Sequence, residues 1–137
     1  MWTPKEYLRQ IKKLDRRIEL DRRKIEKLRA VLDYKPPSGG SGSGSSANRI
    51  PDTLAKIMEY EEQAERLTKR SIELYIEIDK AIKNIQSPTC REVLERRYLL
   101  YQKWTDIADE MHYSLENVYK LHGKALQKIT LNYSKKL

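Results

Sequence analysis

Few of the side chains that could carry out chemistry stand at the spacings that such chemistry needs. The two histidines, His112 and His122, are ten positions apart on different predicted elements, which does not match the close ligand spacing of a zinc site. Two carboxylate pairs are spaced for one helix face, Glu92 with Glu95 and Asp106 with Asp109. No sequence pattern predicts a cleft around these pairs, so a general acid–base pair is not expected.

Phosphate-binding and nucleophile patterns are also missing from the sequence. Four of the five glycines lie in the segment 36–47. No strand pattern precedes this segment and no Lys-Ser/Thr pair follows it, so it does not match a phosphate-binding loop. The single cysteine, Cys90, has no base at a matching spacing and is expected to be a structural or surface thiol. We therefore expect no enzyme activity, no catalytic residues, no metal and no cofactor.

Hydrogen-bonding and basic side chains are instead concentrated at the start of the last predicted helix. Ser114 is a suitable N-cap for a helix from Leu115 to about Leu131. An exposed helix of this kind fits the major groove of DNA, where polar groups contact base edges and lysines contact phosphates. The predicted DNA-contacting residues are Ser114, Leu115, Glu116, Asn117, Tyr119, Lys120 and Lys124.

A short amphipathic segment precedes this helix and is expected to support it. Residues 104–111 predict a helix, and residues 112–114 predict a three-residue turn after it. The small Ala108 would let the two backbones approach each other, and four apolar side chains would fill the angle between the helices: Ile107, Met111, Val118 and Leu121. Before this segment, Ser87 and Pro88 predict the start of another helix that extends to Leu99.

Single residues in this C-terminal region have simple expected roles. Trp104 is expected in the core at the turn of the motif. His122 is expected at the surface, with contact to DNA bases as the alternative. Gly123 either allows a close approach of another helix or backbone or is incidental, and both are open. For Tyr119, contact with DNA and coverage of the apolar stripe are both open.

The N-terminal half predicts two long helices separated by a linker. Thr3, Pro4 and Glu6 predict the start of the first helix, which covers residues 1–35 as a basic amphipathic segment. Its apolar positions recur every three or four residues, with Asp21 as the one polar position: Tyr7, Ile11, Leu14, Ile18, Ile25, Leu28 and Leu32. Such a heptad pattern predicts pairing with another helix.

The second long helix is predicted over residues 52–86. Its seam positions are Leu54, Ile57, Tyr60, Ala64, Leu67, Leu74, Ile78, Ala81 and Ile85. Residues 36–51 between the two helices are expected to be a flexible linker, since Pro, Gly and Ser dominate the segment and all five prolines are expected to mark borders. Residues 1–35 carry 12 basic and 6 acidic side chains, and residues 50–86 carry 6 and 8. The basic helix could therefore pair with the acidic one, and a homodimer through the same heptads is equally allowed.

Taken together, the 137 residues predict an all-α protein with the two heptad-patterned helices followed by a three-helix helix-turn-helix domain at residues 87–133. The net charge of +8 suits a polyanionic partner such as nucleic acid. No apolar run approaches the length of a membrane span, so we expect no membrane partner.

The C-terminal residues carry a resemblance to a known family. Tyr98, the run from Trp104 to Ala108, Met111, Ser114, Val118, Leu121, Ala125 and Leu126 resemble region 4 of bacterial sigma factors. In that family the pattern binds the promoter −35 element. The whole layout is similar to small phage and prophage regulators of the ArpU/RinA type. Leu115 and Tyr119 stand where many sigma-like recognition helices carry Arg, and no segment resembles the promoter-melting part of a sigma factor.

The resemblance implies a sequence-specific, double-stranded DNA-binding transcriptional regulator, an activator of late genes in a phage or prophage. It also implies RNA polymerase as a partner and the cytoplasm of a bacterial host as the location. A DNA-packaging subunit similar to a small terminase, and a coiled-coil protein-interaction module, are the two alternatives.

Overall fold

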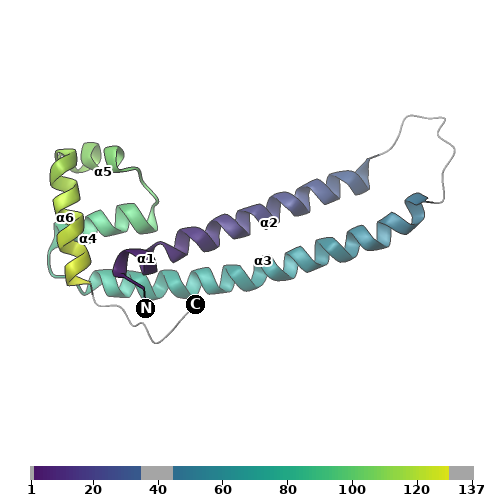
Figure 1. Cartoon of the computed structure of the whole chain (residues 1–137), viewed down its shortest axis with the longest axis horizontal. Coiled ribbons are helices and arrows are strands. Elements are labelled where there is room, and N and C mark those ends of the chain that lie inside the picture. Colours follow the sequence, from purple (N-terminus) through teal and green to yellow (C-terminus); the bar gives the residue numbers. More distant parts are fainter. Residues whose placement is uncertain (1, 35–44, 130–137) are drawn as a thin grey trace. The chain divides into compact units, whose positions relative to one another are not determined.

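The structure, a computed structural model, describes residues 2–34 and 45–129. Over these residues it is helical with no strand, which confirms the predicted all-α class. Figure 1 shows its elements in chain order: α1 (Pro4–Leu8), α2 (Gln10–Asp33), α3 (Ser45–Lys83), α4 (Pro88–Leu94), the π-helix η1 (Glu95–Leu99), α5 (Trp104–Met111) and α6 (Leu115–Lys128). Within the described ranges, no helix is both long enough and apolar enough to cross a membrane.

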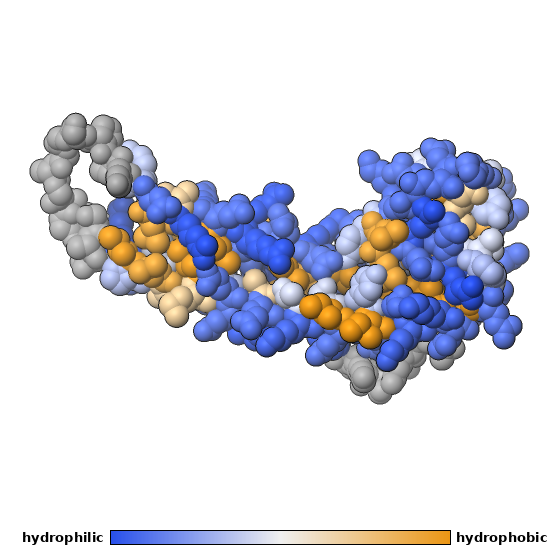
Figure 2. All heavy atoms as spheres, turned by 180° about the vertical axis from the view of Figure 1, so that it is seen from behind, coloured by the Kyte–Doolittle hydropathy of each residue, from blue (hydrophilic) through white to orange (hydrophobic). Residues whose placement is uncertain are grey.

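The chain divides into two compact units, each built mainly from helices. The pair unit consists of residues 14–70, and the terminal unit consists of residues 1–13 and 71–137, in both cases over their described residues. Charged and polar side chains cover most of the face seen in Figure 2, and apolar side chains also reach the surface there.

The pair unit is held together by the predicted heptad positions. Ile18 and Ile25 of α2 and Ile57 of α3 are buried. The guanidinium of Arg29 on α2 forms an ion pair with the carboxylate of Glu61 on α3. The unit therefore uses its apolar heptad positions within one chain.

Asp21 is the polar position of this seam, and it is completely buried. Neither of its carboxylate oxygens has a hydrogen-bond partner among the described residues. The nearest opposite charge is Nε of Arg17, 3.8 Å from Oδ1. A buried carboxylate without hydrogen bonds destabilises the folded state relative to an apolar side chain of similar size.

Two predictions about α3 were wrong. The helix begins at Ser45, so residues 45–51 of the predicted linker are helical and Pro51 lies inside the helix; residues 36–44 lie outside the described residues. A proline removes one hydrogen bond to the preceding turn and its ring crowds a carbonyl of that turn, but its φ angle suits a helix, and α3 continues through Pro51. Leu54 is 47% exposed and lies outside the seam. The buried positions of the seam on α3 begin at Ile57.

In the terminal unit, α1 and the start of α2 pack against the end of α3. Thr3 and Glu6 form the predicted capping box at the start of α1. The hydroxyl of the buried Tyr7 donates a hydrogen bond to Oε1 of Glu77, with 2.6 Å between the oxygens. The largest fully buried apolar side chains of these segments are Tyr7, Leu8, Ile11, Leu74, Ile78 and Ile82.

The segment from Pro88 to Leu99 is helical as predicted, but it is not a single α-helix. The Ser87 hydroxyl accepts a hydrogen bond from the backbone N–H of Cys90, so the predicted cap of α4 is confirmed. Residues 95–99 then form the π-helix η1, in which the N–H of Leu100 donates to the carbonyl of Glu95. Tyr101 follows with φ 57°, in the left-handed region, and ends the segment.

Candidate nucleic-acid interface

The helices α5 and α6 share one small apolar core with α4. Val93 of α4, Ile107 and Ala108 of α5, and Val118 of α6 are buried in it. Trp104, Met111 and Leu121 pack against this core and are partly buried. The predicted filling of the angle between the two helices is therefore confirmed, and Trp104 lies at the edge of this core.

The turn between α5 and α6 is fixed by backbone hydrogen bonds. His112 ends α5 in the left-handed conformation, with φ 59° and ψ 40°. The N–H of Tyr113 then donates to the carbonyl of Ala108 at 3.0 Å. Ser114 starts α6 as predicted, because its hydroxyl accepts a hydrogen bond from the N–H of Asn117 at 3.1 Å. These contacts set the direction in which α6 leaves the turn.

The predicted DNA-contacting residues lie on or next to the exposed side of α6. Leu115 is 37% exposed and Tyr119 is 48% exposed, whereas Asn117 is half-buried. The remaining members of the predicted set are all exposed: Ser114, Glu116, Lys120 and Lys124. Within the described part of the chain, this side of α6 is therefore accessible from Ser114 to Lys124.

A continuous exposed stripe runs along α6, which we call the outer face of α6: Glu116, Lys120, Gly123 and Gln127. Its members follow each other at intervals of four, three and four residues, so they lie on one side of the helix. A Cβ atom at Gly123 would meet nothing within 4 Å. Among the described residues, therefore, no other helix or backbone approaches Gly123.

The charge of α6 differs from that of α5. On α6, Lys120, Lys124 and Lys128 outnumber the single acidic residue, Glu116, whose carboxylate lies 3.9 Å from Nζ of Lys120. On α5, three acidic residues are exposed: Asp106, Asp109 and Glu110. A polyanion is therefore attracted to α6 and repelled by the outer side of α5.

An aromatic cluster lies beside the outer face of α6. The Trp104 ring packs edge-on against Tyr119 and His122, with ring centroids 5.3 Å and 4.7 Å apart. The guanidinium of Arg97 lies over the Trp104 ring at 4.3 Å. Tyr119 therefore covers the tryptophan and is also half-exposed, so it is available to a ligand of α6.

His122 belongs to this cluster, and its expected surface position was wrong. It is only 8% exposed, and its Nε2 is hydrogen-bonded to the Tyr98 hydroxyl at 2.7 Å. Burial, followed by the nearby charges of Lys5, Arg97 and Arg9, lowers the pKa of His122 from 6.5 to about 4. Burial also raises the pKa of Tyr98. The imidazole of His122 is thus neutral at pH 7 and lies on the buried side of α6.

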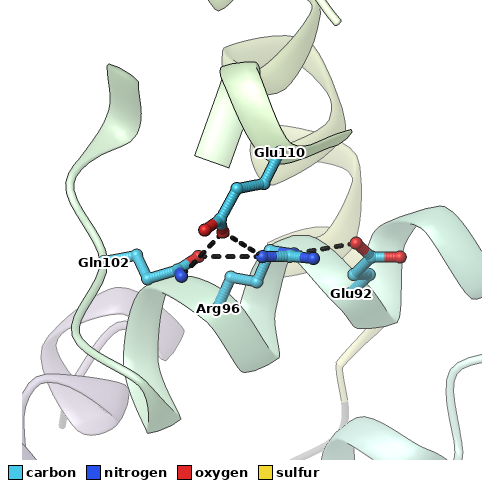
Figure 3. A network of polar contacts seen from close by, with 4 residues as sticks. All are labelled: Glu92, Arg96, Gln102 and Glu110. Carbon is cyan, nitrogen blue, oxygen red and sulfur yellow. Dashed lines mark hydrogen bonds and ion pairs between the residues drawn. The ribbon is translucent and has the colours of Figure 1, made fainter. Parts of the chain in front are cut away.

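A polar network ties α5 to the segment before it (Figure 3). Nε of Arg96 lies 2.8 Å from Oε2 of Glu92, and Nη1 lies 3.2 Å from Oε1 of Gln102. The Glu110 carboxylate of α5 accepts hydrogen bonds from both Arg96 and Gln102. Glu92 and Glu110 therefore serve as partners of one guanidinium, and this network holds α5 in place.

Sequence reasoning missed the roles of His122 and Arg96. The spacing of Val118, His122 and Ala125, four and then three residues, places the histidine on the buried side of α6 and could have indicated its burial. No local pattern predicted the network, because Arg96 meets Gln102 and Glu110 only through the π-helix and the loop after it.

In the terminal unit, two helices joined by a tight turn thus leave one side of the basic helix α6 exposed. The chain belongs to the family described as a protein of unknown function, DUF1492, whose model matches residues 40–130. No curated protein and no solved structure matches it.

Proposed function

We propose that this protein is a sequence-specific, double-stranded DNA-binding transcriptional regulator, in which α5 and α6 act as a helix-turn-helix and α6 enters the major groove. The observation that carries the proposal is the outer face of α6, which is exposed along the helix and carries a glutamate, a lysine, a glycine and a glutamine. The sequence of this region resembles region 4 of sigma factors, and the layout of the chain resembles regulators of the ArpU/RinA type.

The shape of the outer face supports close contact with a duplex. The major groove of B-DNA is about 12 Å wide and admits one α-helix. Gly123 has no side chain and no neighbour within 4 Å, so the helix backbone can come close to a ligand at this position. No internal packing explains the glycine, which costs about 1 kcal/mol of helix stability relative to alanine.

The side chains on the outer face of α6 and next to it supply both kinds of contact that DNA recognition uses. Lys120 and Lys124 provide positive charge for phosphates. Glu116, the half-exposed Tyr119 and Gln127 provide groups that can contact base edges, and a carboxylate next to cytosine accepts a hydrogen bond from its amino group. The Lys120–Glu116 pair is exposed, so little energy is needed to separate it on binding.

In this proposal the protein acts in the cytoplasm of a bacterial host, as an activator of phage or prophage late genes together with RNA polymerase. It acts by binding and not by catalysis. The Arg96 network and the His122–Tyr98 pair then position the two helices, and neither contacts the DNA.

The proposal is tested by DNA binding of the full chain over a series of salt concentrations. Duplexes bound from a random pool provide the ligand. Lys120→Ala and Lys124→Ala should each weaken binding and reduce the slope of log K against log[salt] by about 0.9. Lys80→Ala removes an exposed lysine of α3 and is the matched control, with no expected change.

Two further results bear on the placement of the face. Gly123→Gln should weaken DNA binding while the thermal stability stays equal or rises, because the added side chain meets only open space in the free protein. If Lys120→Ala and Lys124→Ala both bind DNA as tightly as the parent at every salt concentration, α6 is not the DNA-binding helix.

A further inference from the structure

The exposed side of α6 has one apolar edge and one basic edge. Leu115 is 37% exposed and Tyr119 is 48% exposed, although both side chains are large and mainly apolar. They are four residues apart, so they leave the helix within about 40° of each other. Lys120 and Lys124 have the same spacing and lie on the other side of Gly123. We call the first pair the apolar edge of α6 and the second pair its basic edge.

The two edges require different groups on a duplex. Leu115 and Lys124 are nine residues apart, which is about two and a half turns of a helix, so they point in nearly opposite directions. If the basic edge contacts the phosphates of one strand, the apolar edge lies away from those phosphates and meets other groups of the groove. The apolar group that an unmodified base pair presents in the major groove is the C5-methyl of thymine.

Both members of the apolar edge are held in place by contacts inside the terminal unit. The Ser114 hydroxyl accepts a hydrogen bond from the N–H of Asn117 at 3.1 Å, which fixes the first turn of α6, where Leu115 lies. The Tyr119 ring packs edge-on against Trp104, with ring centroids 5.3 Å apart. Side chains that are already ordered lose little conformational freedom when a ligand covers them. The apolar edge is therefore suited to a small apolar group at a defined position.

We propose that the apolar edge of α6 recognises thymine, with the C5-methyl group of one thymine packed between Leu115 and Tyr119. Side chains one turn apart on a helix have Cβ atoms about 5–6 Å apart. Carbon atoms in contact are about 3.5–4.0 Å apart, so one methyl group can touch both side chains. Leu115 is the specificity-determining residue, and Tyr119 provides the second surface. The inference rests on the proposed function, because it names a base that the DNA-binding helix selects.

The size of the expected discrimination follows from the methyl group alone. Burial of one CH₂ or methyl group contributes about a fourfold gain in affinity. Uracil has the same hydrogen-bonding groups as thymine and lacks only this methyl group. Replacement of thymine by uracil therefore isolates the contact from every hydrogen bond in the interface.

Uracil replacement is measured on duplexes that the full chain selects from a random pool. Each thymine of the selected sequence is replaced by uracil, one at a time, at one fixed salt concentration. Replacement at one position should weaken binding of the parent about fourfold. With Leu115→Ala, the same replacement should change the affinity less than about 1.5-fold, because the variant lacks the side chain that the methyl group contacts.

Two variants are matched controls for Leu115→Ala. Leu100→Ala removes another exposed leucine of the terminal unit, outside α6, and should keep the full effect of uracil. Lys120→Ala should weaken binding to the thymine and uracil duplexes by the same factor, because a phosphate contact does not depend on the base. Circular dichroism confirms that each variant is folded.

A second measurement adds the methyl group instead of removing it. Cytosine, paired with guanine, replaces the thymine at the sensitive position, and it is compared with 5-methylcytosine. The parent should bind the methylated duplex about fourfold more tightly. Leu115→Ala should bind the two duplexes equally. This comparison reports the methyl group on a different base pair, so it does not depend on thymine O4.

Three results would overturn the inference. These are a selected sequence in which no thymine is sensitive to uracil, a uracil effect that Leu115→Ala leaves unchanged, or a mass of the DNA-free chain by light scattering that Leu115→Ala alters. The last result would assign the apolar edge to contact between copies of the protein. The salt dependence of Lys120→Ala and Lys124→Ala is measured separately, so DNA binding by α6 can hold while thymine recognition fails. If the chain binds no duplex, both proposals are overturned.

Discussion

Acidification should lower the free energy of unfolding through the buried side chain of His122. His122 is 8% exposed, and its ring lies between Tyr98 and Trp104. Its pKa is about 4 in the folded protein, against 6.5 for an exposed histidine, because burial and then the cations of Lys5, Arg97 and Arg9 disfavour the charged form. In the unfolded chain the same side chain takes up a proton near pH 6.5.

The sign and size of the effect follow from proton linkage. Between pH 6.5 and pH 4 the unfolded state binds more protons than the folded state, so the free energy of unfolding falls as the pH falls. The contribution of the neutral His122 side chain to the free energy of unfolding is fully present above pH 6.5 and is lost by pH 4. A pKa of about 4 in place of 6.5 corresponds to about 3 kcal/mol over this window. Such a loss is a large fraction of the stability of a small domain.

The measurement compares the parent with His122→Gln by urea denaturation at pH 7.5, 6.5, 5.5 and 4. Trp104 fluorescence reports the region, since its ring centroid lies 4.7 Å from that of His122. Glutamine can still accept a hydrogen bond from Tyr98 but does not titrate. The parent should lose about 3 kcal/mol relative to the variant on acidification. The carboxylates titrate in both proteins, so their effect on stability cancels in this comparison.

The control is His112→Asn, which removes the exposed histidine of the turn and keeps a residue that tolerates positive φ. Its pH profile should run parallel to that of the parent. The reasoning is refuted if His122→Gln also runs parallel to the parent, or if the His122 ring titrates near pH 6.5 by NMR in the folded protein.

Three further substitutions test other parts of the structure by thermal or chemical denaturation. Asp21→Leu should stabilise the protein by about 1–4 kcal/mol, because it replaces a fully buried carboxylate without hydrogen bonds; Asp33→Leu makes the same change at an exposed position of α2 and should stay within about 0.5 kcal/mol. Gly123→Ala should stabilise by about 1 kcal/mol, since a Cβ there meets nothing. His112→Gly should stabilise by about 0.5–1 kcal/mol, because glycine adopts its positive φ without strain.

Each of these predictions has a clear contrary result. A loss of stability in Asp21→Leu would mean that the carboxylate has partners in solution. Destabilisation by Gly123→Ala would place another part of the molecule against the outer face of α6. An unchanged or lower stability of His112→Gly would mean that the turn relaxes to another conformation.

Much of the local structure followed from the sequence because the deciding contacts are short in sequence. Ser87 and Ser114 cap helices by bonding to an N–H three residues ahead, so the starts of α4 and α6 could be predicted. The heptad positions Ile18, Asp21 and Ile25 could be predicted as one side of a helix, and they are buried. Pro51 misled the prediction, since a proline weakens a helix locally without always ending it.

Other features depend on residues far apart in the chain, and only the tertiary structure decided them. His122 is buried next to Tyr98, which lies 24 residues earlier in the chain and forms a hydrogen bond with it. Leu54 is exposed because the partner helix lies against Ile57, and a heptad pattern does not say which of two neighbouring stripes another helix will cover. The periodicity of each sequence segment thus determined which side chains lie on the same side of a helix. Whether that side is buried depends on which other segment packs against it, and only the tertiary structure decides this.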